Sequence, residues 1–257
     1  MIKLVASDID GTLLRGGNTE IGGEIFAQIR RLKEAGILFA AASGRQYTSL
    51  RRLFAPAAEE IVYLCENGAI LYRDGAVIGK RPMDRGKAER LIRQIQAQED
   101  MEVLISGADT SYLMPKHREY ADHIRYFVGN NTVLVERAEE IPEEILKVSA
   151  YCRSGAAVYD RTFAAAWRGT FQAAAAGEKW LDFTEADKGW GLEELCRVLG
   201  IGMEETVVFG DHFNDLSMLH KSGHPWIMEG SVLETAGYAK KEGFSVTDRV
   251  ETVLAGL

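Results

Sequence analysis

The sequence predicts an α/β fold in which a doubly wound parallel sheet, with helices on both faces, is interrupted by an inserted α/β domain. Three observations support this prediction. Short apolar runs alternate with a segment of helical periodicity near the start of the chain, the pattern changes near residue 84, and it returns after residue 184. The 257 residues are enough for one large core with a second domain inserted.

The first part of the chain predicts three strands. Each is a compact apolar run that ends in polar or glycine residues, as buried parallel strands do. Because a helical segment separates the first two runs, the order favours parallel pairing through crossover helices. The three predicted strands are residues 2–6, 37–42 and 61–65.

Residues 21–35 predict the first crossover helix. Ile25, Ile29 and Leu32 recur at spacings of three and four, which places them on one helical face. Gly36 follows as a C-cap, so the helix should end there.

An inserted segment follows a predicted hairpin at residues 70–78, in which Asp74-Gly75 supports the turn. Helix-like and short strand-like segments then alternate, and a second hairpin surrounds Gly177. We therefore expect residues 1–83 and 185–257 to form the core and residues 84–184 to form an α/β cap. The predicted elements after the first hairpin are a helix at 86–98, strands at 103–106, 111–114, 171–175 and 179–183, a helix at 190–199, a strand at 206–209 and a helix that includes 216–219.

Composition narrows the function classes. The formal net charge of −8 argues against nucleic acid as a partner, because phosphate backbones are bound by clustered Lys and Arg. Cys65, Cys152 and Cys196 lack the spacing of a disulfide framework or a zinc site. No apolar run approaches membrane-spanning length, and a core strand follows Met1 without room for a secretory signal. We expect a cytoplasmic protein without a membrane partner, either a monomer or a small homo-oligomer.

Two carboxylates, Asp8 and Asp10, stand at the carboxyl end of the first strand, where open α/β sheets carry their active sites. Two acidic groups so close together repel unless a cation or a shared proton relieves them. They indicate a metal site, an acid/base pair, or both. Asp-x-Asp-Gly is also a common turn composition, so the tetrapeptide alone leaves a plain strand-ending turn equally open.

Three further polar clusters follow apolar segments or precede a helix, and with them the chain closely resembles the haloacid dehalogenase-like phosphohydrolase superfamily. The first motif is Asp8-Ile9-Asp10-Gly11-Thr12, the second is Ser43, the third is Lys188, and the fourth runs from Gly210-Asp211 to Asn214-Asp215. The resemblance implies a Rossmann-like core. Only 35 residues separate Asp8 from Ser43, so the insertion must lie between the second and third motifs. That position, together with the run Glu66-Asn67-Gly68-Ala69, is typical of the Cof-type branch with its large α/β cap, also called C2 or type IIB.

The requirements of phosphoryl transfer assign a role to each motif beside the resemblance. Asp8 would attack phosphorus and form an aspartyl phosphate, and Asp10 would protonate the leaving group and later deprotonate water. The family's Mg²⁺ ligands map to Asp8, to the backbone carbonyl of Asp10 and to Asp211. Asp215 would orient metal-bound water or pair with Lys188.

Phosphate binding is expected from donors at the ends of the other strands and at a helix start. They are the Ser43 hydroxyl, the Gly44 backbone amide, the Lys188 ammonium and the Asn214 side chain. Taken singly, each of these residues also fits a loop, a surface charge or a helix cap.

The expected activity is that of a phosphoric monoester hydrolase acting on a small phosphorylated metabolite, with sugar phosphates first among the candidates. Candidate substrate contacts are Arg45 and, from a basic and aromatic stretch of the cap, His117, Arg118 and Tyr120. Because spacing alone does not select a site, that stretch fits a solvated helix face better than a substrate contact. One alternative function is a phosphomutase that passes the phosphoryl group to another hydroxyl of a sugar phosphate. A second is a non-enzymatic module that senses a phosphorylated ligand.

Overall fold

The structure is a computed structural model that describes residues 1–128 and 130–257, and its described chain divides into two compact units. The first unit comprises Met1–Arg45, Leu50–Gly79 and Asp187–Leu257. The second comprises Gln46–Ser49 and Lys80–Ala186.

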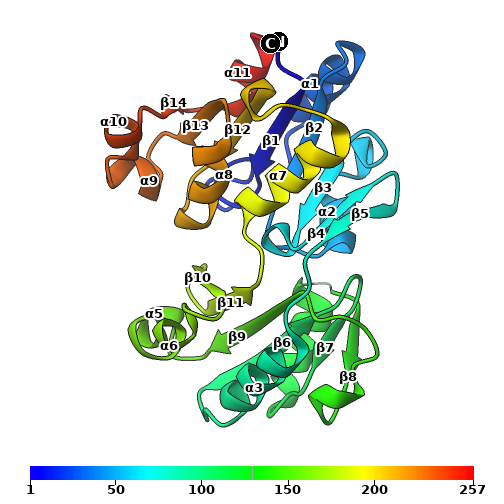
Figure 1. The fold of residues 1–257 in the computed structure, drawn as a ribbon, viewed down its shortest axis with the longest axis vertical. Coiled ribbons are helices and arrows are strands. Elements are labelled where there is room, and N and C mark those ends of the chain that lie inside the picture. Colours follow the sequence, from blue (N-terminus) through cyan, green and yellow to red (C-terminus); the bar gives the residue numbers. More distant parts are fainter. Residues whose placement is uncertain (129) are drawn as a thin grey trace. The chain divides into compact units, whose positions relative to one another are not determined.

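The first unit is built on an eight-stranded sheet with the order β14-β13-β12-β1-β2-β3-β4-β5 (Figure 1). The strands from β14 to β3 pair in parallel, and β3 pairs with β4 in the antiparallel sense. The predicted doubly wound parallel core is confirmed. The strands are β1 Leu4–Asp8, β2 Leu38–Ala42, β3 Val62–Cys65, β4 Ile70–Arg73, β5 Ala76–Lys80, β12 Thr206–Gly210, β13 His224–Met228 and β14 Ser245–Thr247.

Helices of the first unit follow the predicted periodicity. In α1 (Gly23–Glu34), Ile25, Ile29 and Leu32 are all buried, as their spacing predicted. Two helices, α7 (Lys188–Leu199) and α8 (Leu216–Lys221), pack against each other (Figure 1). Helix α7 also packs against β3 and β4, and α8 packs against β12 and β13. The remaining helices in the sequence segments that join these strands or follow β14 are α2 Tyr47–Leu53, α9 Val232–Thr235, α10 Tyr238–Glu242 and α11 Val250–Ala255.

The start of α7 differs from the prediction by two residues, and the difference matters for the site. The Asp187 side chain accepts a hydrogen bond from the Trp190 backbone N–H at 2.7 Å, which caps the helix. Lys188 is therefore the first helical residue rather than part of the preceding loop. At the other end, Gly200 closes the helix in the left-handed conformation that glycine adopts most easily.

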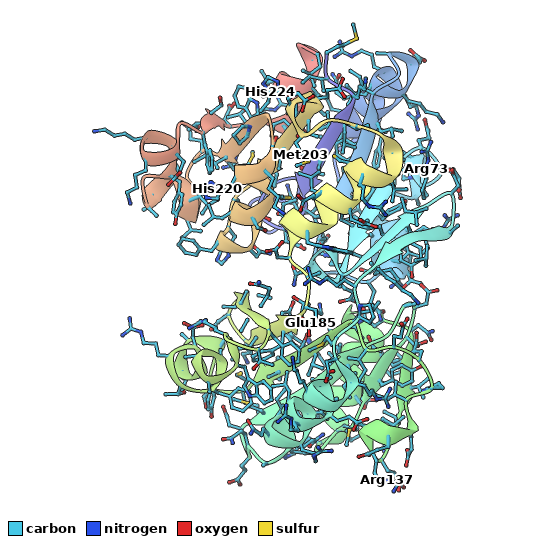
Figure 2. The ribbon with its side chains drawn as sticks, viewed as in Figure 1. Arg73, Arg137, Glu185, Met203, His220 and His224 are labelled. Carbon is cyan, nitrogen blue, oxygen red and sulfur yellow. The ribbon has the colours of Figure 1, made fainter. Side chains whose placement is uncertain are left out.

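The second unit has a six-stranded sheet with the order β10-β11-β9-β6-β7-β8 (Figure 1). One face of this sheet packs on α3 (Arg85–Gln96), which contributes Ala88, Leu91, Ile92 and Ile95 to a buried apolar cluster. The strands are β6 Met101–Ser106, β7 Ser111–Leu113, β8 Thr132–Leu134, β9 Lys147–Cys152, β10 Gln172–Ala176 and β11 Trp180–Thr184, and the other helices are α4 Arg118–Asp122, α5 Ala156–Tyr159 and α6 Ala165–Trp167. Glu185, labelled in Figure 2, lies in the short segment that leads from β11 to α7.

The topology of the first unit identifies one strand as its centre. From β1 the chain builds the sheet in one direction through β2 and β3, and later in the other direction through β12, β13 and β14. Crevices form outside the carboxyl ends of the strands where the order reverses in this way. The end of β1 is therefore the place where a binding site is expected.

Candidate active site

Asp8 is the last residue of β1, a strand that is buried along its whole length. Its side chain is only 7% exposed. Gly11, three residues later, has a φ of 101°, and a Cβ there would lie 2.1 Å from Oδ2 of Asp211. The first motif needs glycine at this position because the fourth motif approaches its backbone so closely.

Lys188 lies between two carboxylates. Its ammonium donates to Oδ1 of Asp8 at 2.5 Å and to Oδ1 of Asp215 at 2.6 Å, and all three side chains are buried. The other oxygen of Asp215 accepts the backbone N–H groups of Asp211 and His212, both at 3.0 Å. The structure thus brings the first, third and fourth motifs together across 180 residues of sequence.

The charges of this group are unbalanced. Burial raises the pKa of Asp8 well above its ordinary value, and the neighbouring carboxylates of Asp215 and Asp211 raise it further, while Lys188 opposes the shift. Burial and Asp215 also raise the pKa of Asp211. Burial opposes a charge on Lys188, yet Asp215 and Asp8 together raise its pKa. One ammonium facing three carboxylates leaves a net negative site that a cation would stabilise.

The donor set fits a hard divalent cation. Asp8, Asp211 and Asp215 each offer a carboxylate oxygen, and these atoms lie within 4.8 Å of one another. Oδ2 of Asp8 is buried and has no hydrogen-bond partner in the described structure. Asp215 uses both of its oxygens on Lys188 and on backbone amides, which suits a group that orients the cluster better than one that binds the ion directly.

Asp10 is not part of this carboxylate cluster. Its side chain is 53% exposed, and both of its oxygens accept hydrogen bonds from Arg45. The predicted metal ligand from Asp10 was its backbone carbonyl. The contact with Arg45 involves only the Asp10 side chain, so it does not prevent that carbonyl from binding a metal. The Thr12 hydroxyl, also from the first motif, donates to Oδ1 of Asp211 at 3.2 Å.

Ser43 and Gly44 follow β2, the strand that pairs with β1 so that Asp8 is opposite Ala42. Ser43 is buried, and its hydroxyl oxygen accepts the backbone N–H of Arg45 at 3.2 Å. A Cβ at Gly44 would lie 3.1 Å from Oδ1 of Asn67. This places the second motif beside the turn that follows β3.

Asn67 lies among the motif residues, although the sequence reasoning assigned it no role. Its Oδ1 accepts from Asn214 of the fourth motif at 3.5 Å, and its backbone N–H donates to the Ser43 carbonyl at 2.9 Å. The sequence feature that could have indicated Asn67 was the run Glu66-Asn67-Gly68, which was used only as a feature typical of the Cof-type branch. Asn67 links the second and fourth motifs.

In the second unit, the three candidate substrate residues have different surroundings. Nδ1 of His117 lies 2.8 Å from Oε1 of the buried Glu102. The Arg118 side chain is 94% exposed. Tyr120 is buried and packs against Tyr151 and Trp180, so its ring is a packing group rather than an exposed contact.

A row of polar residues crosses the second sheet and was missed by the sequence reasoning. This polar row consists of Gln172, Thr184, Lys147, Ser106, Ser111 and Thr132. These residues are register partners on successive strands from β10 to β8. The alternation of Lys147, Ser149 and Tyr151 with apolar residues in β9 was the signal that could have revealed a polar face. Two residues further along β9 and β11, on the same face, Ser149 donates to Asp182 at 2.6 Å. One face of this sheet is therefore apolar, and the polar row lies at one end of the opposite face.

Across residues 1–128 and 130–257, none of the helices combines the length and the apolar character that crossing a bilayer requires.

The known proteins that this chain resembles are hydrolases and phosphatases. A family model for haloacid dehalogenase-like hydrolases matches residues 5–248. The Escherichia coli (strain K12) protein named 5-amino-6-(5-phospho-D-ribitylamino)uracil phosphatase YbjI is 26% identical over 269 residues, which cover 98% of this chain and 96% of the relative. An HMP-PP phosphatase of Serratia proteamaculans (strain 568) is 28% identical over 243 residues, with 89% of this chain and 84% of the relative covered.

A solved structure shows the same fold. The HAD subclass IIB sugar phosphatase BT4131 superposes with a TM-score of 0.80 over 99% of this chain and 98% of its own, at 20% identity. The predicted resemblance to the haloacid dehalogenase-like superfamily is confirmed, and the fold is that of a solved structure of subclass IIB. Because the family model spans nearly the whole sequence, this chain belongs to the haloacid dehalogenase-like hydrolases.

Proposed function

We propose that the protein is a Mg²⁺-dependent phosphatase that hydrolyses a small phosphorylated metabolite through an aspartyl phosphate on Asp8. One observation carries the proposal. Asp8 is buried with one oxygen bound by Lys188 at 2.5 Å, while its other oxygen has no hydrogen-bond partner among the described residues. A carboxylate held on one side and open on the other is suited to nucleophilic attack.

The reaction divides into two steps. In the first, Oδ2 of Asp8 forms a bond to phosphorus while the bond to the leaving oxygen breaks, and Asp10 gives that oxygen a proton. In the second, Asp10 removes a proton from water, the water oxygen attacks phosphorus, and the bond to Asp8 breaks. Inorganic phosphate and the free Asp8 carboxylate result. Lys188 remains protonated throughout because Asp215 and Asp8 raise its pKa.

Asp8, Asp211 and the Asp10 backbone carbonyl would hold Mg²⁺, and Asp215 would orient the cluster. When bound, the cation would reduce the repulsion between these carboxylates and the charged phosphoryl group. Ser43, the Gly44 amide, Lys188 and Asn214 would bind the phosphoryl oxygens. The link from Asn214 through Asn67 to Ser43 supports this shared role.

Residues 84–184 are proposed to act as the cap that selects the substrate, with sugar phosphates as the first candidate class. The name of the E. coli relative describes a phosphate ester on a ribityl chain, which carries several hydroxyl groups. A hydroxylated leaving group would need hydroxyl, amide or ammonium partners, and the members of the polar row that are not buried are Gln172 and Thr132. Among the cap candidates, His117 and Arg118 remain proposed contacts on the grounds of their exposure.

The test is phosphate release from a panel of sugar phosphates, nucleotides, pyridoxal phosphate and flavin mononucleotide, with Mg²⁺ present. The wild-type protein should release phosphate, and removal of Mg²⁺ with EDTA should abolish release until the ion is restored. Asp8→Asn should remove turnover of every substrate. A suitable control is Asp74→Asn, which alters a carboxylate that is 76% exposed in the turn between β4 and β5 and should leave turnover unchanged. Turnover that survives in Asp8→Asn would rule out the nucleophile assignment.

A further inference from the structure

Arg45 binds the side chain of Asp10 through two parallel hydrogen bonds. Its Nε donates to Oδ2 of Asp10 at 2.9 Å, and its Nη2 donates to Oδ1 at 2.5 Å. This fork-to-carboxylate arrangement fixes the plane and direction of the carboxyl group as well as its position. Sequence reasoning had offered Arg45 only as a candidate substrate contact.

The backbone of Arg45 is itself held on both sides. Its N–H donates to the Ser43 hydroxyl at 3.2 Å, and its carbonyl accepts the Glu66 backbone N–H at 3.1 Å. A connected path therefore leads from the turn after β3, through Arg45, to Asp10.

That turn has an unusual backbone. Glu66, Asn67 and Gly68 have φ values of 52°, 56° and 88°. Three successive residues therefore have a positive φ, which residues other than glycine rarely adopt. A Cβ at Gly68 would lie 2.5 Å from the carbonyl oxygen of Asp187. Strained backbone of this kind persists where the surrounding structure holds it, and it is frequent at functional sites.

The contact between Arg45 and Asp10 contributes little to folding. The side chains are 37% and 53% exposed, and ion pairs this open to solvent are screened. Its larger effect is on orientation, because an exposed aspartate without a partner would populate several rotamers. Proton transfer depends on the donor lying within hydrogen-bond reach of the leaving oxygen, so this order bears on the reaction.

We propose that Arg45 is a positioning residue that holds Asp10 in the orientation required for proton transfer to the leaving group. The inference rests on the proposed role of Asp10 as acid and base. An ionised carboxyl group has about four lone-pair sites, and the two bonds from Arg45 occupy one site on each oxygen. Each oxygen keeps a free site that can carry the proton to the leaving oxygen and later accept one from water.

The test compares kcat/KM for two substrates, because this ratio covers the steps up to departure of the leaving group. An alkyl phosphate, such as a hexose 6-phosphate turned over by the wild-type protein, releases a strongly basic alkoxide that needs a proton. 4-Nitrophenyl phosphate releases a weakly basic phenolate that does not. Arg45→Met should lower kcat/KM about 10- to 100-fold for the alkyl phosphate and less than about 3-fold for the aryl phosphate. Arg45→Lys, which keeps the charge without the fork, should recover part of the loss.

A double variant separates positioning from substrate binding. If Arg45 acts through Asp10, adding Arg45→Met to Asp10→Asn should cause no further loss with either substrate. The matched control is Arg197→Met, which breaks another two-bond pair, with Glu194 on α7, and should leave both rates unchanged.

Equal losses for both substrates, or multiplicative losses in the double variant, would overturn the positioning role and leave the phosphatase proposal intact. A wild-type protein without Asp8-dependent turnover would overturn the proposed function and, with it, this inference.

Discussion

Replacing Lys188 with methionine should destabilise the metal-free protein strongly. The Lys188 ammonium is 1% exposed and contacts Asp8 and Asp215 at 2.5 and 2.6 Å. Lys188→Met would leave these two carboxylates, together with Asp211, without their buried cation. Removing one partner of a buried ion pair costs about 3–5 kcal/mol of unfolding free energy.

The assay is urea unfolding at pH 7 in EDTA, followed by far-ultraviolet circular dichroism. With the denaturant dependence expected for a chain of this size, the predicted loss lowers the unfolding midpoint of Lys188→Met by about 1–2 M. The matched control is Lys221→Met, which breaks the exposed pair between Lys221 and Glu193 and should cost less than about 1 kcal/mol.

Addition of Mg²⁺ extends the same test. A bound cation would replace part of the missing positive charge, so saturating Mg²⁺ should raise the midpoint of Lys188→Met more than that of the wild-type protein. If Lys188→Met and Lys221→Met unfold at the same urea concentration in EDTA, the electrostatic account of this cluster is wrong.

Three further predictions concern the same structure. Burial raises the pKa of Asp8 above its ordinary value near 3.8, so the metal-free folded state binds a proton that the unfolded chain releases. The stability of the metal-free protein should therefore fall as pH rises from about 4 through the raised pKa. Asp8→Asn should weaken this dependence and raise the Tm at pH 7 by about 2–4 °C in a thermal scan without Mg²⁺. Gly11→Ala places a Cβ 2.1 Å from the Asp211 carboxylate at a φ of 101°, so it should lower unfolding free energy by about 1–3 kcal/mol and reduce the Tm gain from Mg²⁺, whereas Gly16→Ala, whose Cβ meets no atom within 4 Å, should keep that gain. Burial raises the pKa of the Cys152 and Cys196 thiols to about 11, so neither should react with a thiol reagent at pH 8 until urea unfolds the chain; rapid labelling of the native protein would contradict their burial.

Local patterns accounted for the core elements because their signals depend on neighbouring residues. The spacing of Ile25, Ile29 and Leu32 predicted the buried face of α1, and all three are buried. Lys188 shows the limit of such signals, since its helix begins two residues earlier than predicted. The cause is a side-chain cap from Asp187.

The sequence predicted less about which side chains lie together in the second unit, because strand register decides which side chains share a face of the sheet. Lys147 is 41 positions from Ser106 and 37 from Thr184, and these members of the polar row become neighbours only through strand pairing. Tyr120 and Arg118 are two residues apart, yet one is buried and the other is exposed. Composition and spacing do not distinguish such positions without the surrounding sheet.

The sequence by itself determined the family, the parallel core and the order of four motifs, three at strand ends and one at a helix start, because each motif is a short run whose residue types and spacing are visible locally. Only the tertiary structure decided which motif residues meet. It joined Lys188 to both Asp8 and Asp215, placed Asn67 between Ser43 and Asn214, and paired Arg45 with Asp10. These contacts depend on strand register, helix starts and side-chain direction, which packing of the whole chain sets rather than any local run of residues.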